Sequence, residues 1–576
     1  MISLALQFFG QIERHISTNL LLEDLKGRPC LGYRRVPIDC PPIGFTGLHC
    51  SSVFGITRIA TSLMDQPNHN LNKRDSLGFT PLIWAAVCGH EGVARLLLER
   101  QSVNLDKSDR DLRRAPLSWA AVMGHEGIVR LLLERASANP DGTDGWWGKT
   151  PRLVNMVRGR SYVNPNRPDE YGQTPVLLAA KEGHEGVMKL LLGRKDIKPD
   201  IPDYRGQTPL SEAALREYDR VVKLLLGRED VNPNMPSKSS SPPLLWAAEN
   251  GYDGVVKLLL TREDVNPNVR AYLGWTPLWL AAANGRDGAV KLLLEREDVN
   301  PNAPDISGRT PLALAAAKGC DGVAKLLLER GDVGPNIPDN DGRTPLLWAA
   351  ENGHDGVVKL LLARKDVNPN LPDNDGRTPL SWASSYWRDG AMKLLLGRDD
   401  VNPNMPNNDG RTPLSLVAGD GREGVLELLL GQEDINPDIP DNDGRTPLSW
   451  AALNGRDRVV ELLLKRADVS PDPPDNDGRT PLSWAAERGR DGVVKLLLGR
   501  EDLNPNLPDN RGLTPLLWAA ANGRDGVVKL LLGWEGINPG IPNKDGLTPL
   551  SLASKKRHKE VVKLLQARIS ANHHPA

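Results

Sequence analysis

Apolar residues occur at helical spacing in two short stretches of the segment DGRTPLLWAAENGHDGVVKLLLARKDVNPN, residues 341–370. The first stretch follows Thr344, a residue that can cap a helix N-terminus, and starts with Pro345, which fits the first helical position. Leu346 and Ala349 lie on its small apolar face. Gly353 suits the left-handed residue that ends such a helix. The pattern therefore predicts a first short helix between Thr344 and Gly353.

A second helix is predicted after Gly353, with Val357, Val358 and residues 360–362 buried and with Lys359 and Arg364 in water. The Val-Asn-Pro-Asn sequence ends this helix, because proline cannot continue it. Each helix has only about two to three turns, which is too short to be stable alone in water. The unit therefore needs neighbouring units to pack against.

The unit recurs along the chain at a nearly constant spacing. Successive Thr-Pro steps are 34 residues apart from Thr174 onward, except for a gap of 68 between Thr208 and Thr276, where Pro242-Pro243 occupies the intermediate position. The starts before Thr174 are Thr46, Thr80, Ala115 and Thr150, separated by 34, 35, 35 and then 24 residues. The remaining starts are Thr310, Thr344, Thr378, Thr412, Thr446, Thr480, Thr514 and Thr548. Sixteen such units predict a solenoid.

The recurring residues G-x-T-P-L, A-A, G-H, V-V-K-L-L-L and D-V-N resemble the ankyrin repeat over nearly everything after Thr46. The resemblance implies an all-α ankyrin-repeat solenoid, elongated and curved, with stacked helix-turn-helix units and hairpin loops. One departure concerns the histidine that usually follows T-P-L. Only the first unit keeps it, as His49, and most others have Ser or Leu, as at Ser381 and Leu347. The usual histidine hydrogen bonds are therefore not expected in most repeats.

The predicted organisation has five parts. Residues 1–45 lie outside the repeat and contain an amphipathic helical pattern, followed by an irregular Pro- and Gly-rich segment. Residues 46–149 form a first block of three repeats, and residues 150–173 a truncated repeat that we expect to be a fault or hinge in the stack. Residues 174–568 form a regular array of twelve repeats that ends in a polar cap, and residues 569–576 a disordered tail.

The N-terminal segment has two interpretations. It can be a cap that covers the apolar side of the first repeat, which is what a solenoid end requires. Alternatively, the sequence around Thr46, TGLHCSSVFG, resembles the point where ankyrin arrays begin in large fungal receptor-like proteins, downstream of a nucleotide-binding NACHT domain. The second interpretation makes residues 1–45 the remnant of a lost domain.

Charge and composition point away from several classes of partner. Lys and Arg total 72 against 73 Asp and Glu, so there is no net charge to attract nucleic acid or an anionic membrane. No apolar run reaches the length of a membrane span. The five cysteines lack metal-ligand spacing, and reduced thiols are typical of the cytosol. We expect a cytoplasmic protein, with the nucleus as the alternative.

The sequence contains no catalytic constellation, so no enzymatic activity, cofactor, metal or small-molecule substrate is expected. Gly148-Lys149-Thr150 resembles the end of a phosphate-binding loop, but Thr143 stands where the first glycine is required. His90, His125, His184 and His354 recur at the same repeat position and are interpreted as structural. The D-N-D-G sequences lack the spacing of a calcium loop and are interpreted as hairpin turns.

Eight tryptophans share one position on the first helix of their repeats, and neighbouring copies are expected to lie in a row. They are Trp84, Trp119, Trp246, Trp348, Trp382, Trp450, Trp484 and Trp518. We favour packing between neighbouring first helices, because tryptophan is bulky and mostly buried. The alternative is a row of exposed aromatic residues that bind a partner.

The predicted function is that of a non-catalytic protein–protein interaction scaffold, whose groove and hairpin tips contact one or more proteins. The tip sequence is almost identical between repeats, which leaves the residues before the G-H or G-R step as the selective ones. We call these the first-helix ends: Glu351, Asn352, Ser385, Tyr386, Gly419, Asp420, Leu453, Asn454, Glu487 and Arg488. Trp348, Trp382, Trp450, Trp484 and Trp518 complete the candidate partner-binding set. The alternatives are the ligand-sensing arm of a NACHT-type intracellular receptor and an elastic spacer.

Overall fold

The computed structural model describes residues 44–66, 69–135, 163–236 and 242–573. Within these ranges it contains thirty helices and no strand. The structure divides into unit 1, which ends at Val299, and unit 2, which begins at Asn300. The amphipathic helix expected in the N-terminal segment and the loop around Gly148 lie outside the described residues.

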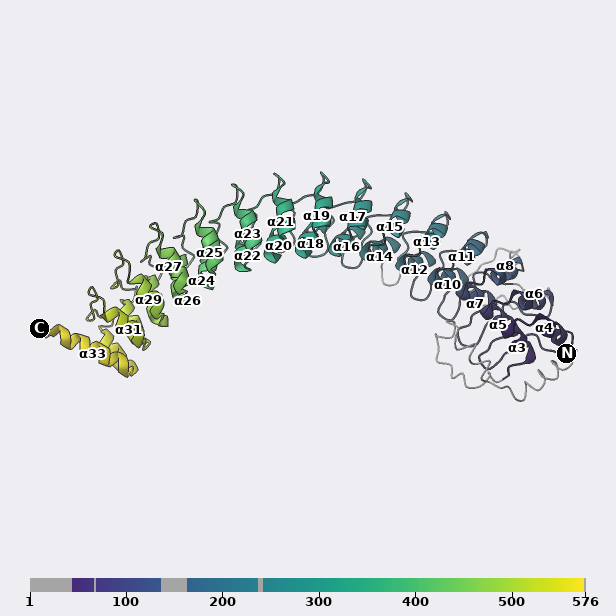
Figure 1. The fold of residues 1–576 in the computed structure, drawn as a ribbon, viewed down its shortest axis with the longest axis horizontal. Coiled ribbons are helices and arrows are strands. Elements are labelled where there is room, and N and C mark those ends of the chain that lie inside the picture. Colours follow the sequence, from purple (N-terminus) through teal and green to yellow (C-terminus); the bar gives the residue numbers. More distant parts are fainter. Residues whose placement is uncertain (1–43, 67–68, 136–162, 237–241, 574–576) are drawn as a thin grey trace. The chain divides into compact units, whose positions relative to one another are not determined.

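Each repeat consists of a first and a second helix, and Figure 1 shows the pairs following one another along the chain. In unit 1 the first helices are α3 (Gly47–Phe54), α5 (Pro81–Cys88), α7 (Pro116–Met123), α10 (Pro175–Glu182), α12 (Pro209–Leu215), α14 (Pro243–Asn250) and α16 (Pro277–Ala283). The second helices are α4 (Thr57–Met64), α6 (Glu91–Glu99), α8 (Glu126–Glu134), α11 (Glu185–Leu192), α13 (Asp219–Leu226), α15 (Asp253–Leu260) and α17 (Asp287–Leu294).

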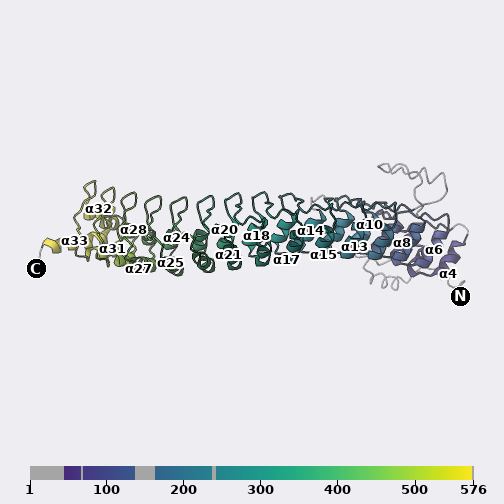
Figure 2. The same cartoon turned by 90° about the horizontal axis from the view of Figure 1, so that it is seen from above.

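Unit 2 repeats the same arrangement. Its first helices are α18 (Pro311–Lys318), α20 (Pro345–Asn352), α22 (Pro379–Ser385), α24 (Pro413–Asp420), α26 (Pro447–Asn454), α28 (Pro481–Arg488), α30 (Pro515–Ala521) and α32 (Pro549–Lys556). The second helices are α19 (Asp321–Leu328), α21 (Asp355–Leu362), α23 (Asp389–Leu396), α25 (Glu423–Leu430), α27 (Asp457–Leu464), α29 (Asp491–Leu497), α31 (Asp525–Leu532) and α33 (Lys559–His573). Within each unit, first helices pack on first helices and second helices on second helices. In unit 2 the connecting loops lie along one side of these two layers (Figure 2).

The helix boundaries follow the predicted signals. The Thr344 hydroxyl accepts a hydrogen bond from the Leu347 amide at 3.3 Å, Pro345 begins α20, and Gly353 ends it with a φ of 73°. Helices begin after proline because its missing N–H is not needed in the first turn. The helix-turn-helix prediction and the all-α solenoid class are therefore confirmed.

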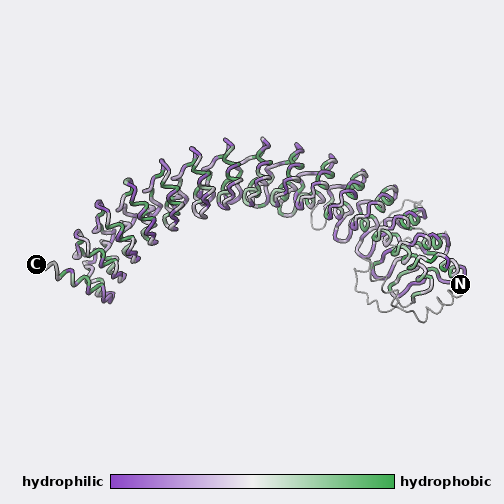
Figure 3. Tube along the Cα trace, viewed as in Figure 1, coloured by the Kyte–Doolittle hydropathy of each residue, from purple (hydrophilic) through white to green (hydrophobic). Residues whose placement is uncertain are grey.

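Hydrophobic residues recur in every helix pair (Figure 3), and those of the second helix are buried less completely than expected. Val357, Val358 and Leu361 are buried, but Leu360 and Leu362 are only half-buried. Arg364 does not simply face water either. Its guanidinium binds Asp366 through two hydrogen bonds of 2.9 and 2.7 Å, and the pair recurs after the other second helices from Arg194 to Arg500, except after α25, where Gln432 replaces the arginine.

The first block and the regular array are in contact on either side of the truncated repeat, where we expected a fault or hinge. Helix α7 packs on α10, and α8 packs on α11, although residues 136–162 between them are outside the described part. Arg194 Nη1 donates to the Leu133 carbonyl at 2.8 Å, and Arg114 pairs with Asp169 at 2.9 Å. The helix pairs on either side of residues 136–162 therefore stack on each other, because each interface needs only two adjacent helix pairs.

The C-terminal boundary also differs from the prediction. Helix α33 continues to His573, so residues 569–573 are helical rather than the start of a disordered tail. In the preceding turn, Arg557 occupies the position where most other repeats have glycine, with a φ of 63°. The last repeat is therefore complete, with two full helices.

Candidate functional site

Seven of the eight tryptophans that share this position on the first helices bind a buried aspartate of their own hairpin, whereas Trp246 Nε1 has no hydrogen-bond partner among the described residues. Trp382 Nε1 donates to Asp373 Oδ2 at 2.7 Å, and Trp484 Nε1 donates to Asp475 Oδ2 at 2.9 Å. Both indole side chains are buried, as are the carboxylates. The same bond joins Trp84 to Asp75, Trp119 to Asp109, Trp348 to Asp339, Trp450 to Asp441, and Trp518 to Asp509.

The aspartate organises the hairpin as well as holding the tryptophan. In the repeat that starts at Thr344, Asp339 Oδ1 accepts hydrogen bonds from the amides of Asp341 and Arg343 at 3.0 and 2.8 Å. A carboxylate that accepts two amides and an indole N–H has its acceptors satisfied without a cation. The D-N-D-G sequences are thus turns, as predicted.

Arginines lie between successive tryptophans in unit 2. The Arg343 guanidinium lies 4.8 Å from the Trp348 ring centre and 5.0 Å from the Trp382 ring centre. Arg445 has the same position between Trp450 and Trp484. Because each cation is shared by two aromatic rings, the row of tryptophans is covered rather than presented to solvent. Trp382, Trp484 and Trp518 are buried and Trp348 and Trp450 half-buried, which supports packing over the exposed-anchor alternative.

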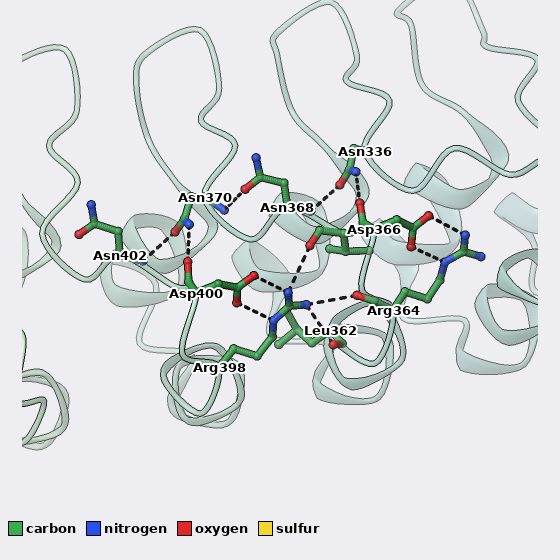
Figure 4. A network of polar contacts seen from close by, with 10 residues as sticks. Asn336, Leu362, Arg364, Asp366, Asn368, Asn370, Arg398, Asp400 and Asn402 are labelled. Atoms are coloured by element: carbon green, nitrogen blue, oxygen red, sulfur yellow. Dashed lines mark hydrogen bonds and ion pairs between the residues drawn. The ribbon is translucent and has the colours of Figure 1, made fainter.

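Asparagines join the loops of neighbouring repeats at two levels. At the hairpin tips of unit 2, Asn374 Nδ2 donates to the Asn340 carbonyl at 3.0 Å, and Asn408 Nδ2 donates to the Asn374 carbonyl at 2.9 Å. At the Asn-Pro-Asn sequences, Asn370 Nδ2 donates to the Asp400 carbonyl at 2.6 Å, as Figure 4 shows. Near-identity of the loop sequences is therefore explained by hydrogen bonds between repeats.

The residue that directly precedes the second helix also joins neighbouring repeats. In unit 1, His125 Nε2 contacts the Val87 carbonyl at 3.0 Å, and His184 Nε2 contacts the Val122 carbonyl at 2.8 Å. In unit 2, Arg388 Nε donates to the Glu351 carbonyl at 3.0 Å. The structural interpretation of these histidines is confirmed, and arginine makes the same contact in later repeats.

His49 makes the hydrogen bonds that the other repeats lack. Its Nδ1 contacts the Thr46 hydroxyl at 2.8 Å, and its Nε2 contacts the carbonyls of Lys73 and Phe79, both at 3.1 Å. Burial lowers the pKa of this imidazole to about 4. Where serine replaces the histidine, as at Ser381, the hydroxyl contacts only the cap threonine, at 3.1 Å.

The first-helix ends differ in exposure from repeat to repeat. Tyr386, Asp420 and Arg488 are exposed, and Gly419 is buried. The other six are half-buried: Glu351, Asn352, Ser385, Leu453, Asn454 and Glu487. Several of the half-buried residues also hold the repeat together.

Three contacts of the half-buried first-helix ends lie within the stack of repeats. Asn352 Nδ2 donates to the Trp348 carbonyl at 2.9 Å, and Asn454 Nδ2 donates to the Gly419 carbonyl at 3.0 Å. Glu351 pairs with Arg343 at 3.2 Å, and desolvation raises its pKa. The exposed members are therefore the first-helix ends whose side chains remain accessible to solvent.

Sequence reasoning did not assign a role to the arginine of G-R-T, which covers the tryptophans. Its recurrence one residue before the cap threonine was the available signal. In the described residues no group of three His, Cys, Asp or Glu side chains could hold a metal ion. Among the described helices, none has the length and apolar character needed to cross a bilayer.

The sequence matches the family model of ankyrin repeats (three copies) at residues 39–144, 148–236, 244–337, 331–407, 387–473, 467–543 and 501–574. These matches cover nearly the whole chain, in agreement with the paired helices and hairpin loops described above. The chain belongs to the ankyrin repeat family. Comparison with curated proteins finds no match.

Proposed function

We propose that this chain is a non-catalytic scaffold that binds other proteins through the first-helix ends of unit 2. Ankyrin repeats are generally protein-interaction modules, and the family match covers the array. The observation that carries the proposal is the difference between positions that join repeats and positions that are exposed. The loop asparagines that join repeats recur in most repeats of unit 2, whereas Tyr386, Asp420 and Arg488 occupy one position, are exposed and differ from each other.

The variation has a physical consequence for recognition. Equivalent places on three repeats of unit 2 carry an aromatic side chain, a carboxylate and a guanidinium. One surface therefore presents aromatic, acidic and basic groups. Exposed aromatic residues and arginines contribute strongly to protein interfaces, and charges select among partners. A protein segment that crosses several repeats can meet each of them in turn.

The test is capture of a partner by the immobilised full-length chain. We expect saturable binding that is lost when Tyr386, Asp420 and Arg488 are all replaced by alanine. The matched control replaces Lys359, Lys393 and Lys495, which are exposed on second helices of the same unit. Binding that survives the first triple substitution, or that is lost only in the control, would refute the assigned surface. Absence of any saturable partner would favour the elastic spacer.

A cytoplasmic or nuclear location and membership of a NACHT-type receptor system remain predictions from the sequence. The receptor alternative has its own test, which is the presence of a NACHT-encoding reading frame directly upstream of this one. Fractionation of cells that express the chain tests the location.

A further inference from the structure

Within the described part of unit 2, the second helices pack closely on their neighbours at every boundary except one. Helix α21 packs on α23, α25 on α27, and α27 on α29, but α23 and α25 do not pack closely. The first helices of the same two repeats, α22 and α24, pack on each other. Unit 2 is therefore open on its second-helix side at this boundary, while its first-helix side is continuous.

Trp387 lies in the turn between α22 and α23, where neighbouring repeats have glycine. A Cβ atom placed on Gly353 would lie 2.6 Å from the Cδ atom of Arg388, in the next repeat. Gly421 has the same relation to Arg456, also at 2.6 Å. The arginine that precedes each of these second helices thus packs directly against the turn glycine of the repeat before it. Trp387 places a side chain in that space.

Arg422, which directly precedes α25, lies on the Trp387 ring instead. Its guanidinium is 3.4 Å from the ring centre. The equivalent Arg388 also donates from Nε to the Glu351 carbonyl of the preceding repeat, at 3.0 Å. Among the described residues, the side chain of Arg422 makes no such hydrogen bond. The indole ring therefore separates the two repeats at the start of α25.

A second replacement removes a bond at the other end of α25. Arg398, which follows α23, donates from Nη1 to the carbonyl of Leu362, the last residue of α21, at 3.0 Å. Gln432 stands at this position after α25. Its Nε2 donates to the Leu428 carbonyl of α25 itself, at 3.3 Å. The end of α25 is therefore not bound to α23 as α23 is bound to α21.

The glycine near the start of each second helix reports the opening. A Cβ atom placed on Gly356 would collide with the Asp321 carboxylate, and one placed on Gly390 would collide with the Asp355 carboxylate. In these pairs the acidic residue of one second helix lies against the next second helix. A Cβ atom placed on Gly424, in α25, would have no atom of another repeat within 4 Å. Both ends of α25 are thus released from α23.

The left-handed backbone of Trp387 does not by itself cause the opening. Glu217 replaces the turn glycine in unit 1, with a φ of 60° against 58° for Trp387. Helices α13 and α15 nevertheless pack on each other there, and Arg262 Nη1 donates to the Arg228 carbonyl at 3.0 Å. The opening in unit 2 therefore follows from the indole ring and the missing arginine.

We propose that the boundary between α23 and α25 is a bending joint, at which unit 2 opens and closes its second-helix side about the contact between α22 and α24. Motion concentrates where few contacts resist it, and a few residues then absorb the change. Tyr386 and Asp420 end the first helices on the two sides of this joint. Bending therefore adjusts the distance between two residues that the proposed function assigns to a partner. This consequence rests on the proposed function, whereas the joint itself does not.

Distances between spin labels on the full-length chain test the joint. Labels carried by a non-natural amino acid at Lys359 and Glu427 span α21 to α25 and include the joint. Labels at Lys325 and Lys393 span α19 to α23, which are two boundaries without it. All four native side chains are exposed at the same position of their second helices. We expect the first pair to have a distance longer by about 3–4 Å, the thickness of an aromatic ring, and a broader distribution.

The substitutions Trp387→Gly and Gln432→Arg together restore the residues of the neighbouring repeats. The double variant should shorten and narrow the first distribution until it matches the second, because α25 can then pack against α23. The matched control is Tyr386→Asn, which removes the adjacent exposed aromatic side chain and introduces the residue found at Asn352 and Asn454. This control should leave both distributions unchanged.

The joint should also be transferable to the preceding boundary. Gly353→Trp combined with Arg398→Gln should lengthen and broaden the distribution between the labels at Lys325 and Lys393. Unchanged helix content by circular dichroism shows that each variant is folded.

Equal distributions for the two label pairs in the unmodified chain would overturn the proposal. It is also overturned if the double substitution leaves the longer distance unchanged, or if the longer distance has no greater breadth, which would mean a fixed opening. If the joint fails and the chain still captures a saturable partner, the scaffold function stands. If the joint is found and no partner binds, only the proposed function is wrong.

Discussion

The repeats of unit 1 and unit 2 have the same helix-pair geometry, but different side chains join their loops. In unit 1, the amide of Tyr204 donates to the carbonyl of Tyr171 at 3.0 Å, and both tyrosine side chains are exposed. In unit 2, the equivalent backbone bond from Asn408 to Asp375, at 2.9 Å, is accompanied by the side-chain bond from Asn408 to Asn374. A backbone hydrogen bond is therefore sufficient to set the register of neighbouring hairpins. In unit 2 the asparagine side chain adds a second hydrogen bond, which explains why the tip sequences there are almost identical.

The comparison extends to the residue that follows the turn glycine, which is histidine in most repeats of the first block and arginine in most of unit 2. Both side chains reach a carbonyl of the preceding repeat. The exposed residues that vary between the repeats of unit 2, such as Tyr386, Asp420 and Arg488, do not take part in these junctions. Partner binding is therefore expected at the positions that vary between the repeats of unit 2.

The substitutions with the largest expected effect test whether tryptophan packing stabilises the repeats of both units. Trp119→Ala in unit 1 and Trp484→Ala in unit 2 should each lower the local free energy of unfolding by ~3–5 kcal/mol, because each removes a buried aromatic side chain and leaves an aspartate without its indole donor. Native-state hydrogen exchange in the affected helix pairs measures this. Unchanged protection in either variant would show that its tryptophan does not hold the repeat.

An effect of intermediate size concerns stability at low pH, which should fall in the first repeat but not in the repeats of unit 2. His49 has a pKa of about 4 in the folded chain against 6.5 for the free side chain, so the unfolded state binds more protons between these values. Stability from this group is complete above about pH 6.5 and is lost as the pH falls, by about 2 kcal/mol at pH 5. Hydrogen exchange should accelerate in α3 but not in α28, where Ser483 replaces the histidine. Equal acceleration in both would contradict this assignment.

The smallest effect concerns the asparagine bonds at the tips. Asn408→Ala should lower local stability by about 0.5–1 kcal/mol, since one hydrogen bond is lost at an exposed position. The control is Tyr204→Ala in unit 1, whose side chain is 65 % exposed and should matter less. Exchange of the hairpin amides on both sides of each site gives the comparison, and equal effects would mean that the asparagine bond adds nothing.

Much of the fold could be predicted from the sequence because its signals are local and repeated. The cap threonines, the proline at the first helical position and the turn glycine each act within a few residues, so the boundaries of α20 followed from them. The stacking across residues 136–162 could not be predicted, because it depends on whether α7 and α10 still fit each other when a repeat is shortened. The end of α33 was misjudged for a similar reason, since tail composition gave no indication of helix length.

The candidate site was predictable only in outline. Variable residues at the first-helix ends could be found by aligning repeats, but their contacts, such as the bond from Asn454 to the Gly419 carbonyl of the preceding repeat, could not. The Trp-to-Asp bond also joins positions nine residues apart across a turn, a contact that periodicity does not reveal.

The central claim is that repeated residues hold the stack while the first-helix ends of unit 2 bind a partner. The most direct test is a photo-reactive amino acid placed singly at Asp420 or Arg488, and for comparison at Lys393 or Lys495 on the second helices of the same unit. The account predicts one saturable cross-linked protein from the first pair of positions and none from the second. Cross-links from Lys393 or Lys495 alone would contradict it.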